Sequence, residues 1–383
     1  MTFVRLIVVA MACTLGATAA TRNHYLITND DLPSPIPNSA TFYTVGATGG
    51  LTQTATVSTR GGGISGGFFG MKRIVVFSGG KSGCAYASNA QTGEIVGIPI
   101  QTLRANPPTK GSKNDGGSSN GIGLAMNARY LYASFSDSNT IGTFQVQAGC
   151  KIKFVTDITV AGLQGGVIDG MAVRGNMLVV TYGDGSIESF NISAGVPVSN
   201  GDEQNSTGSR TGNTYPSDVD ITQDGHYAIF GDTATSTIVE VSDISSGKLT
   251  ATIVYRLGSG ISASNILLSP DQTLLYISNT QGGEITAAFF EKSSGHLSKG
   301  CVSRHLRGFV SGWTYLGALA LEKTTGTGAV VYAAEFGAPS SIAEVKVTSV
   351  AGNCTLRESS KSPIADPNSP GLLTIGAFPP RPF

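Results

Sequence analysis

Leu268-Ser-Pro-Asp-Gln-Thr-Leu-Leu-Tyr-Ile-Ser-Asn279 is the stretch that decides the fold of this chain. A polar turn leads into a strand rich in Leu, Tyr and Ile. A second apolar strand, Ile285-Thr-Ala-Ala-Phe-Phe, follows and runs into a Ser-Gly-His-Leu turn. Short β-branched and aromatic strands separated by turn residues are typical of antiparallel sheets. One copy of this stretch therefore predicts one small antiparallel sheet.

The same strand recurs along the whole chain. Its seven copies begin at Tyr25, Ile74, Tyr130, Met177, Tyr227, Leu275 and Val330. The spacing of roughly 47 to 56 residues is the period of a four-stranded propeller blade. The repeat therefore predicts an all-β fold, a seven-bladed β-propeller of four-stranded blades, as one domain over residues 21–383.

The layout of a blade and the closure of the ring are also predicted. Blade 5 should place its inner strand over 218–222, followed by strands at 226–231, 236–241 and 249–257. The first strand of blade 1, at 24–29, resembles the second strands of the other blades. The inner strand of blade 1 must therefore come from another part of the chain. The apolar stretch 371–378 has no partner of its own. It is predicted to fill that place, which closes the ring and removes an exposed sheet edge.

The N-terminal 20 residues have the pattern of a secretory signal. Arg5 precedes an apolar run at 6–15, and Ala-Thr-Ala follows at 17–19. This run is too short to span a bilayer, and no later segment predicts a membrane span. The chain has 25 basic and 25 acidic residues. Nucleic-acid binding is not expected, because it needs a basic surface that releases counterions.

After signal removal the remaining cysteines are Cys84, Cys150, Cys301 and Cys354. An even number in an oxidising compartment predicts two disulfides, with three possible connectivities. We favour Cys84 with Cys150 and Cys301 with Cys354, because each pair should fall on outer strands of neighbouring blades. The sequons at Asn191, Asn205 and Asn353 predict surface glycans. The protein is expected in the secretory pathway or outside the cell.

In a propeller, the loops between blades and those joining second to third strands emerge on one face, which we call the loop face. The remaining turns form the turn face. Asp-Gly and Ser-Gly turns dominate the turn face, whereas the loop face carries longer loops. Long loops on a rigid scaffold often hold binding sites, so the site is predicted on the loop face.

At the Ser-Pro-Asp-Gln-Thr-Leu-Leu-Tyr-Ile-Ser-Asn repeat and the Ser-Gly-His-Leu turn, the chain resembles the lactonase/carboxymuconate-cyclase superfamily of seven-bladed propellers. Its low charge, many glycines and Pro-Arg-Pro-Phe terminus resemble the secreted fungal branch. That branch includes cell-surface glycoproteins and hetero-Diels-Alderases of tropolone-sesquiterpenoid biosynthesis. Hydrolytic and cycloisomerising relatives use His, Arg and Glu at the channel mouth. In this chain only His305 is expected near the loop face, which disfavours lactone hydrolysis by a histidine base.

Acidic, basic and aromatic residues recur at the predicted loop face. Carboxylates there could act as general acids or hold a hard cation, although Asp also simply begins turns. Arginines at the ends of outer strands could bind an oxyanion or only protect a sheet edge. The predicted catalytic residues are Arg307, Tyr315, Asp232 and Glu335.

Aromatic residues near blade 7 could line an apolar pocket over the channel, or pack between blades. The predicted substrate-binding residues are Trp313, Tyr215, Phe309 and Arg60, and Phe68 and Phe69 could join them. Zinc-site spacing, a P-loop and a dinucleotide fingerprint are missing from the sequence, and neither a cofactor nor a metal is expected.

The resemblance implies a cyclase acting on an apolar small molecule. Like the hetero-Diels-Alderases, it would assist loss of water from a hydroxymethyl tropolone or phenol, and orient the resulting quinone methide against an alkene such as a humulene. Two alternatives remain: a lactonase or muconate-type cyclase, and a non-enzymatic secreted glycoprotein that binds or adheres. The oligomeric state is not predicted.

Overall fold

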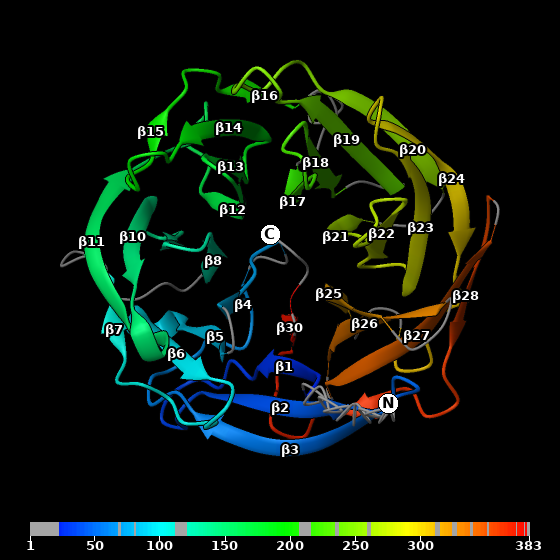
Figure 1. The fold of residues 1–383 in the computed structure, drawn as a ribbon, viewed down its shortest axis with the longest axis horizontal. Helices are drawn as coiled ribbons and strands as arrows, with labels where there is room; N and C mark the ends of the chain where they lie inside the picture. The colour runs from blue at the N-terminus through cyan, green and yellow to red at the C-terminus, as the bar shows by residue number, and fades with distance from the viewer. Residues whose placement is uncertain are drawn as a thin grey trace, which may run out of the picture.

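Seven antiparallel sheets stand in a ring around a central channel in the computed structural model (Figure 1). The structure describes residues 23–67, 70–79, 82–111, 121–206, 216–233, 237–258, 262–310, 315–323, 328–337, 340–350, 352–372, 374–378 and 380. The predicted signal lies outside these residues. The seven-bladed β-propeller is confirmed.

The strands of each blade follow one another from the channel outward. Blade 1 contains β30 (Ile375–Phe378), β1 (Tyr25–Asn29), β2 (Ser39–Val45) and β3 (Leu51–Ser58). Blade 2 contains β4 (Ile74–Gly79), β5 (Ser82–Asn89), β6 (Glu94–Pro99) and β7 (Thr109–Lys110). Blade 3 contains β8 (Ile122–Met126), β9 (Tyr130–Phe135), β10 (Thr140–Val146) and β11 (Ile152–Thr159). Blade 4 contains β12 (Ile168–Arg174), β13 (Met177–Tyr182) and β14 (Ser186–Asn191), with β15 (Val198–Ser199) and β16 (Gln204–Asn205) both paired to β14.

The remaining blades have the same order. Blade 5 contains β17 (Pro216–Ile221), β18 (Tyr227–Asp232), β19 (Thr237–Asp243) and β20 (Ile253–Gly258). Blade 6 contains β21 (Ala263–Leu268), β22 (Leu274–Asn279), β23 (Glu284–Glu291) and β24 (His296–Val302). Blade 7 contains β25 (Tyr315–Lys323), β26 (Gly328–Phe336) and β27 (Ser341–Val350), with β28 (Asn353–Glu358) and β29 (Ile364–Ala365) both paired to β27. Two short 3-10 turns are η1 (Ala90–Thr92) and η2 (Ala148–Cys150).

The ring closes as predicted, through the C-terminal strand. β30 pairs antiparallel with β1, in a register that places Tyr25 opposite Phe378 and Thr28 opposite Ile375. Figure 1 shows the red end of the chain beside the blue first strand. The strand is shorter than the predicted stretch 371–378, but it occupies the predicted place. It removes the free inner edge of blade 1.

The repeat alignment is wrong in one blade. It takes Ile74 as the start of the second strand of blade 2, but β4 lies next to the channel and β5 is second. The reason is composition. β4 reads Ile-Val-Val-Phe and looks like the second strands of other blades, whereas β5 reads Ser-Gly-Cys-Ala-Tyr-Ala. Burial between neighbouring sheets, rather than strand hydropathy, decides which strand takes which place.

Neighbouring blades are joined by packing and by polar links. Buried tyrosines recur on the second strands and fill the space between sheets; they are Tyr25, Tyr86, Tyr132, Tyr182, Tyr276 and Tyr332. Hydroxyl groups of one blade also donate to inner-strand carbonyls of the next. The links are Ser88 Oγ to Ile122 O (3.0 Å), Ser136 Oγ to Ile168 O (2.9 Å), Thr181 Oγ1 to Ser217 O (3.2 Å) and Ser217 Oγ to Ser264 O (2.8 Å). They satisfy carbonyls at the inner edge of each sheet.

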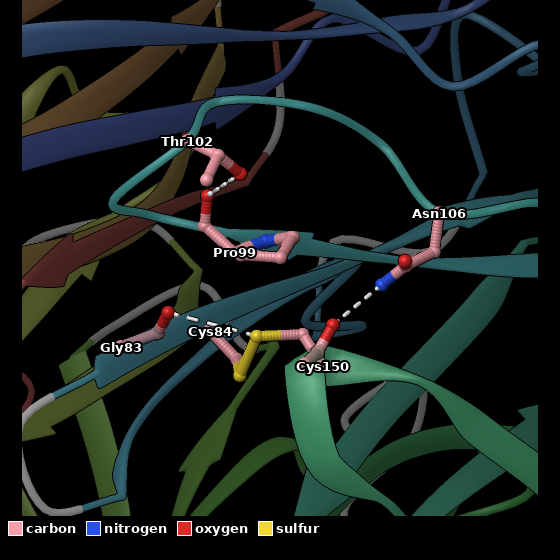
Figure 2. The surroundings of a disulfide bond; sticks show 7 residues. Gly83, Cys84, Pro99, Thr102, Asn106 and Cys150 are labelled. Atoms are coloured by element: carbon pink, nitrogen blue, oxygen red, sulfur yellow. Dashed lines mark hydrogen bonds between the residues drawn. A yellow bond between two sulfur atoms is a disulfide. The ribbon is translucent and has the colours of Figure 1, made fainter.

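Both favoured disulfides are confirmed. Cys301–Cys354 joins the outer strands β24 and β28, as expected. Cys84–Cys150 joins blades 2 and 3, but neither cysteine lies on an outer strand (Figure 2). Cys84 is on the second strand β5, and Cys150 ends the 3-10 turn η2. Asn106 Nδ2 also donates to Gly149 O at 2.9 Å, so a second contact holds the same turn on blade 2 (Figure 2). The chain-entropy relation gives about 4 kcal/mol for loops of 66 and 53 residues.

Across the described part of the chain, the structure contains no helix with the length and hydropathy needed to cross a membrane.

Candidate functional site

A cavity of about 220 Å³ lies at the centre of the ring. Its walls are the inner strands, and most of the side chains on them are apolar. Five inner strands contribute Ile74, Leu124, Met171, Ile266 and Leu319. Apolar walls around a small number of polar groups are typical of small-molecule sites. The channel is therefore the candidate functional site.

The loop-face end of the cavity is closed by residues 70–73, which lead into β4 and which we call the crossing segment. Leu124 N of blade 3 donates to Lys72 O at 2.7 Å. Met71 is 1% exposed, and its sulfur lies 3.8 Å from Ser136 Oγ. A Cβ on Gly70 would lie 1.8 Å from Ser217 O of blade 5. The segment thus reaches from blade 2 to blades 3 and 5, and only glycine fits where it meets blade 5.

The cavity opens at the turn face. Gln223 and Pro270 are exposed, and both line it. They lie in the turns that follow the inner strands β17 and β21, which is the end opposite the crossing segment. Asp218 and Met71, at the other end, are buried. Among the described residues, the channel is therefore covered at the crossing segment and reaches exposed residues among the tight turns. The predicted site lay on the loop face.

Lys72 places a cation at the closed end. Its Nζ lies 3.1 Å from Asp218 Oδ1 and donates to Val219 O at 3.1 Å. The Lys72 side chain is 29% exposed, whereas that of Asp218 is 1% exposed. An ammonium has three donors, so one remains without a partner among the described residues and is available to a ligand. Burial raises the pKa of Asp218, and the charge of Lys72 acts against this.

The two carboxylates that line the cavity are held by backbone groups. Asp218 Oδ2 accepts from Ile266 N at 3.0 Å, and Asp220 Oδ2 accepts from Leu268 N at 3.1 Å. Both donors lie on β21 of the next blade. The N–H groups on the inner edge of blade 6 have no neighbouring strand to pair with, and the two carboxylates accept their hydrogen bonds instead. These bonds fix the positions of both carboxylates and occupy one oxygen of each.

A third carboxyl group lies behind the crossing segment. Asp169 is 1% exposed, and its Oδ1 has no hydrogen-bond partner within the described structure. Burial raises its pKa well above the ordinary value, the charge of Asp218 adds to the rise, and a hydrogen bond from the backbone of Gly70 opposes it. Asp169 is thus a buried carboxyl group close to Asp218, although it does not line the cavity.

The predicted residues around blade 7 lie at the loop face. Arg307 Nε lies 3.3 Å from Glu358 Oε2, and its guanidinium donates to Ser359 O, so it points to the outer part of blade 7. Glu335 is buried under Gly308, where a Cβ would lie 2.2 Å from its Oε2. Burial raises the pKa of Glu335 to about 7, although the Ser341 hydroxyl donates to it. Arg307 and Glu335 are close in the backbone, but their side chains have different partners.

Asp232 belongs to a separate buried pair in blade 5. Burial, and then the charge of Glu240, raise the pKa of Asp232 to about 8. Glu240 accepts from Ser206 Oγ and Thr252 Oγ1, each at 2.6 Å. Neither carboxyl oxygen of Asp232 has a hydrogen-bond partner within the described structure. No contact in the described structure joins Asp232 to Arg307.

The other predicted residues have packing partners or lie outside the described residues. The ring of Tyr315 lies 6.2 Å from that of Phe336, and the ring of Phe309 stacks on His305 at 6.4 Å. Arg60 is exposed, with a left-handed φ of 67°. The predicted residues that lie outside the described residues are Trp313, Tyr215, Phe68 and Phe69. None of the described members of the predicted site lines the cavity.

The three sequon asparagines lie at strand ends. Asn191 ends β14, Asn205 ends β16 and Asn353 begins β28. Asn191 and Asn353 are exposed, and Asn205 is half-buried. These positions suit glycans, whose presence stays a prediction.

The positions of metal-ligating side chains and histidines decide whether the cavity could use a metal ion or a histidine base. Within the described ranges, no group of three His, Cys, Asp or Glu residues has an arrangement that could hold a metal ion. The histidines at positions 24, 226, 296 and 305 are all described, and none lines the cavity.

Sequence reasoning missed Lys72 and Asp218. Lys72 stands in Gly-Met-Lys-Arg before an apolar strand, and Asp218 lies in Asp-Val-Asp-Ile. An Asp-x-Asp pattern on an inner strand is a usable signal, because alternate residues of a strand share a face. Nothing in the sequence joins it to Lys72, three blades away.

Known proteins resemble this chain in fold. No protein-family model matches it, and no curated protein sequence matches it. A solved structure of a protein of unknown function from Desulfotomaculum acetoxidans has a TM-score of 0.59 at 14% identity, covering 92% of this chain and 99% of the other. Two proteins named as putative 6-phosphogluconolactonases, from Bacteroides uniformis and Bacteroides fragilis, have TM-scores of 0.54 and 0.52 at 14% and 16% identity. Each match covers 71% of this chain and 79% of the other. At these identities the likeness shows the fold alone.

Proposed function

We propose that this protein is a small-molecule cyclase that works in its central channel, in the manner of the hetero-Diels-Alderases. The observation that supports this is an apolar cavity that the described residues cover at one end, where the ammonium of Lys72 lies. Dry walls orient an apolar substrate, and the free N–H of Lys72 donates to one of its oxygens. Orientation of two reacting groups can supply several kcal/mol of a cycloaddition barrier, up to about 7–11 kcal/mol in the best cases.

The chemistry needs few groups. An ortho-hydroxymethyl phenol or tropolone loses its hydroxymethyl oxygen as water, and the ring hydroxyl supplies the second proton of that water. The product is a quinone methide. Its oxygen and its exocyclic carbon then form one bond each with the two carbons of an alkene. Lys72 donates to the ring oxygen where negative charge develops, an electrostatic contribution that is strongest in a dry site.

A lactonase is the second candidate, and the solved structures named as putative 6-phosphogluconolactonases favour it. Lys72 could polarise a lactone carbonyl. Hydrolysis also needs a base that activates water. The carboxylates that line the cavity, Asp218 and Asp220, accept from backbone N–H groups, and the histidines lie elsewhere. The cavity therefore suits a cyclisation better than a hydrolysis.

We place the protein in the secretory pathway or outside the cell. Two disulfides support an oxidising compartment, and the N-terminal pattern and the sequons agree with it. The proposal includes glycosylation at the sequons, which mass spectrometry of the secreted protein would test.

The decisive experiment compares two reactions with one preparation. A hydroxymethyl tropolone is incubated with humulene, and a set of lactones is tested in parallel. We expect faster formation of cycloadduct than in the uncatalysed reaction, and loss of that acceleration in Lys72→Met. The exposed Lys248→Met is the matched control and should keep full activity. Acceleration of lactone hydrolysis alone would support the lactonase, and acceleration of neither would support a binding protein.

A further inference from the structure

We propose that the channel loads through the turn face and selects uncharged ligands that carry a hydrogen-bond acceptor, which enters first and reaches Lys72. This inference rests on the proposed function, because it describes the ligand of the same cavity. Three features carry it: the closure at the loop face, the exposed residues at the mouth, and the balance of charge along the walls.

Closure at the loop face follows from the crossing segment. Met71 and Gly70 lie in contact with blades 3 and 5, with no space for a Cβ at Gly70. The contact of Lys72 O with Leu124 N holds the same segment to the inner edge of blade 3. A ligand arriving from the loops would have to displace buried backbone and the Lys72–Asp218 pair.

The mouth at the turn face is formed by short turns and by Pro380, which follows the inner strand β30. Gln223 and Pro270 are exposed and line the cavity. Arg174 donates from Nε and Nη2 to Gln223 O, at 2.9 and 2.7 Å, so the mouth is braced between blades 4 and 5. A ligand therefore passes a fixed polar rim before it meets the apolar walls.

Charge along the walls is balanced. The ionisable side chains that line the cavity are Lys72, Arg174, Asp218 and Asp220. Lys72 is paired with Asp218 at the closed end, so the remaining donor of its ammonium suits a neutral acceptor oxygen. Moving a phosphate or carboxylate into this cavity would cost its hydration without an uncompensated cation to replace it. The cavity should therefore reject anionic sugars and accept apolar ketones, enols or phenols.

The access route is tested by thiol labelling. Ala172→Cys places a thiol on the wall of the cavity. A small methanethiosulfonate reagent modifies this thiol, and the rate is measured in the single variant. It is measured again in double variants that add a bulky residue at the turn face or at the loop face. We expect Gln223→Trp at the mouth to slow labelling several-fold. Val310→Trp, at a loop-face position that is 56% exposed, should leave the rate unchanged. Slowing by Val310→Trp alone, or by neither, would overturn the route.

Ligand selection is tested by calorimetry with three probes: 1-indanone, indane and 6-phosphogluconate. We expect 1-indanone to bind several-fold more tightly than indane, and 6-phosphogluconate not to bind. Lys72→Met should remove the preference for the ketone without weakening indane. Should Lys72→Met fail to fold, Lys72→Arg keeps a donor and should keep part of the preference. Tight binding of 6-phosphogluconate would overturn the selection.

The two proposals fail separately. Binding of 1-indanone through the turn face, without formation of a cycloadduct, would overturn the cyclase and leave the ligand site intact. Cycloadduct formation together with tight binding of anions would support the cyclase and overturn the proposed ligand selection.

Discussion

The ring of Phe378 lies against the backbone of Gly83, so that a Cβ on Gly83 would come within 2.2 Å of Phe378 Cε2. Phe378 ends the strand β30, which closes blade 1, and Gly83 lies near the start of β5 in blade 2. The last strand of the chain therefore has two roles. It completes one blade by pairing with β1, and it packs on the next blade through its final side chain.

Phe378→Ala should lower the free energy of unfolding by about 3–5 kcal/mol, since it removes a buried aromatic ring at the closure. Phe378 is 7% exposed. Urea unfolding followed by fluorescence would measure the change. Val198→Ala, at a position 61% exposed, is the control and should stay within about 0.5 kcal/mol of the native chain. Equal effects of the two substitutions would contradict the closure role.

Gly97→Ala and Gly50→Ala should have opposite effects. A Cβ on Gly97 would lie 1.8 Å from Cys150 O, a backbone atom held by the disulfide, whereas a Cβ on Gly50 has nothing within 4 Å. We expect Gly97→Ala to destabilise by about 1–3 kcal/mol through overpacking. Gly50→Ala should stabilise by about 0.4–1 kcal/mol through the unfolded state. Thermal unfolding of both variants checks the sign of each change.

Replacing Cys301 and Cys354 together by Ser should lower the free energy of unfolding by about 2–5 kcal/mol, since the bridge closes a long loop in the unfolded chain. Denaturant unfolding without reductant would measure it. Peptide mapping of the native protein without reduction should show both bridges and no alkylated cysteine at these positions. A free thiol at Cys84, Cys150, Cys301 or Cys354 would be inconsistent with the pairing.

The buried carboxyl group of Asp30 should make the stability of the protein depend on pH. Burial, and then the charge of Asp366, raise its pKa from 3.8 to about 7, although the hydroxyls of Ser39, Thr28 and Thr41 donate to it. Between these two values the folded chain holds a proton that the unfolded chain has released. The contribution of Asp30 to stability therefore falls as pH rises from about 4 to about 7, by at most about 1.4 kcal/mol per pH unit.

Asp30→Asn keeps the size of the side chain and removes this titration. We expect the variant to gain stability relative to the native chain as pH rises through that window, with no further relative gain well above it. Urea unfolding of both proteins at about pH 5, 6 and 8 gives the comparison. A difference between them that does not change with pH would rule out a raised pKa at Asp30.

The number of blades and the closing strand were predictable, because each depends on patterns repeated along the chain. The disulfide partners were predicted correctly, although the premise that they lie on outer strands holds only for Cys301 and Cys354. Period-2 alternation places one face of every strand in a core, and a fixed repeat places equivalent strands in equivalent sheets. The exception is blade 2. There the apolar Ile74-Val-Val-Phe resembles a second strand, while the true one contains Gly83, Cys84 and Ser88. Strand hydropathy therefore does not give the order of the two strands, because the more apolar β4 is only partly buried beside the channel, whereas residues 83–89 of β5 are buried.

The candidate site was not predictable in this way. Lys72 and Asp218 meet because residues 70–73 of blade 2 reach across to blade 5. Among the described residues, the same segment covers the loop-face end of the cavity. The repeat pattern predicts the strands of each blade, because it depends only on the local alternation of apolar and polar residues. The approach of two blades that are not neighbours depends on the closed ring, the absence of a Cβ at Gly70 and the burial of Met71, which exist together only in the folded chain.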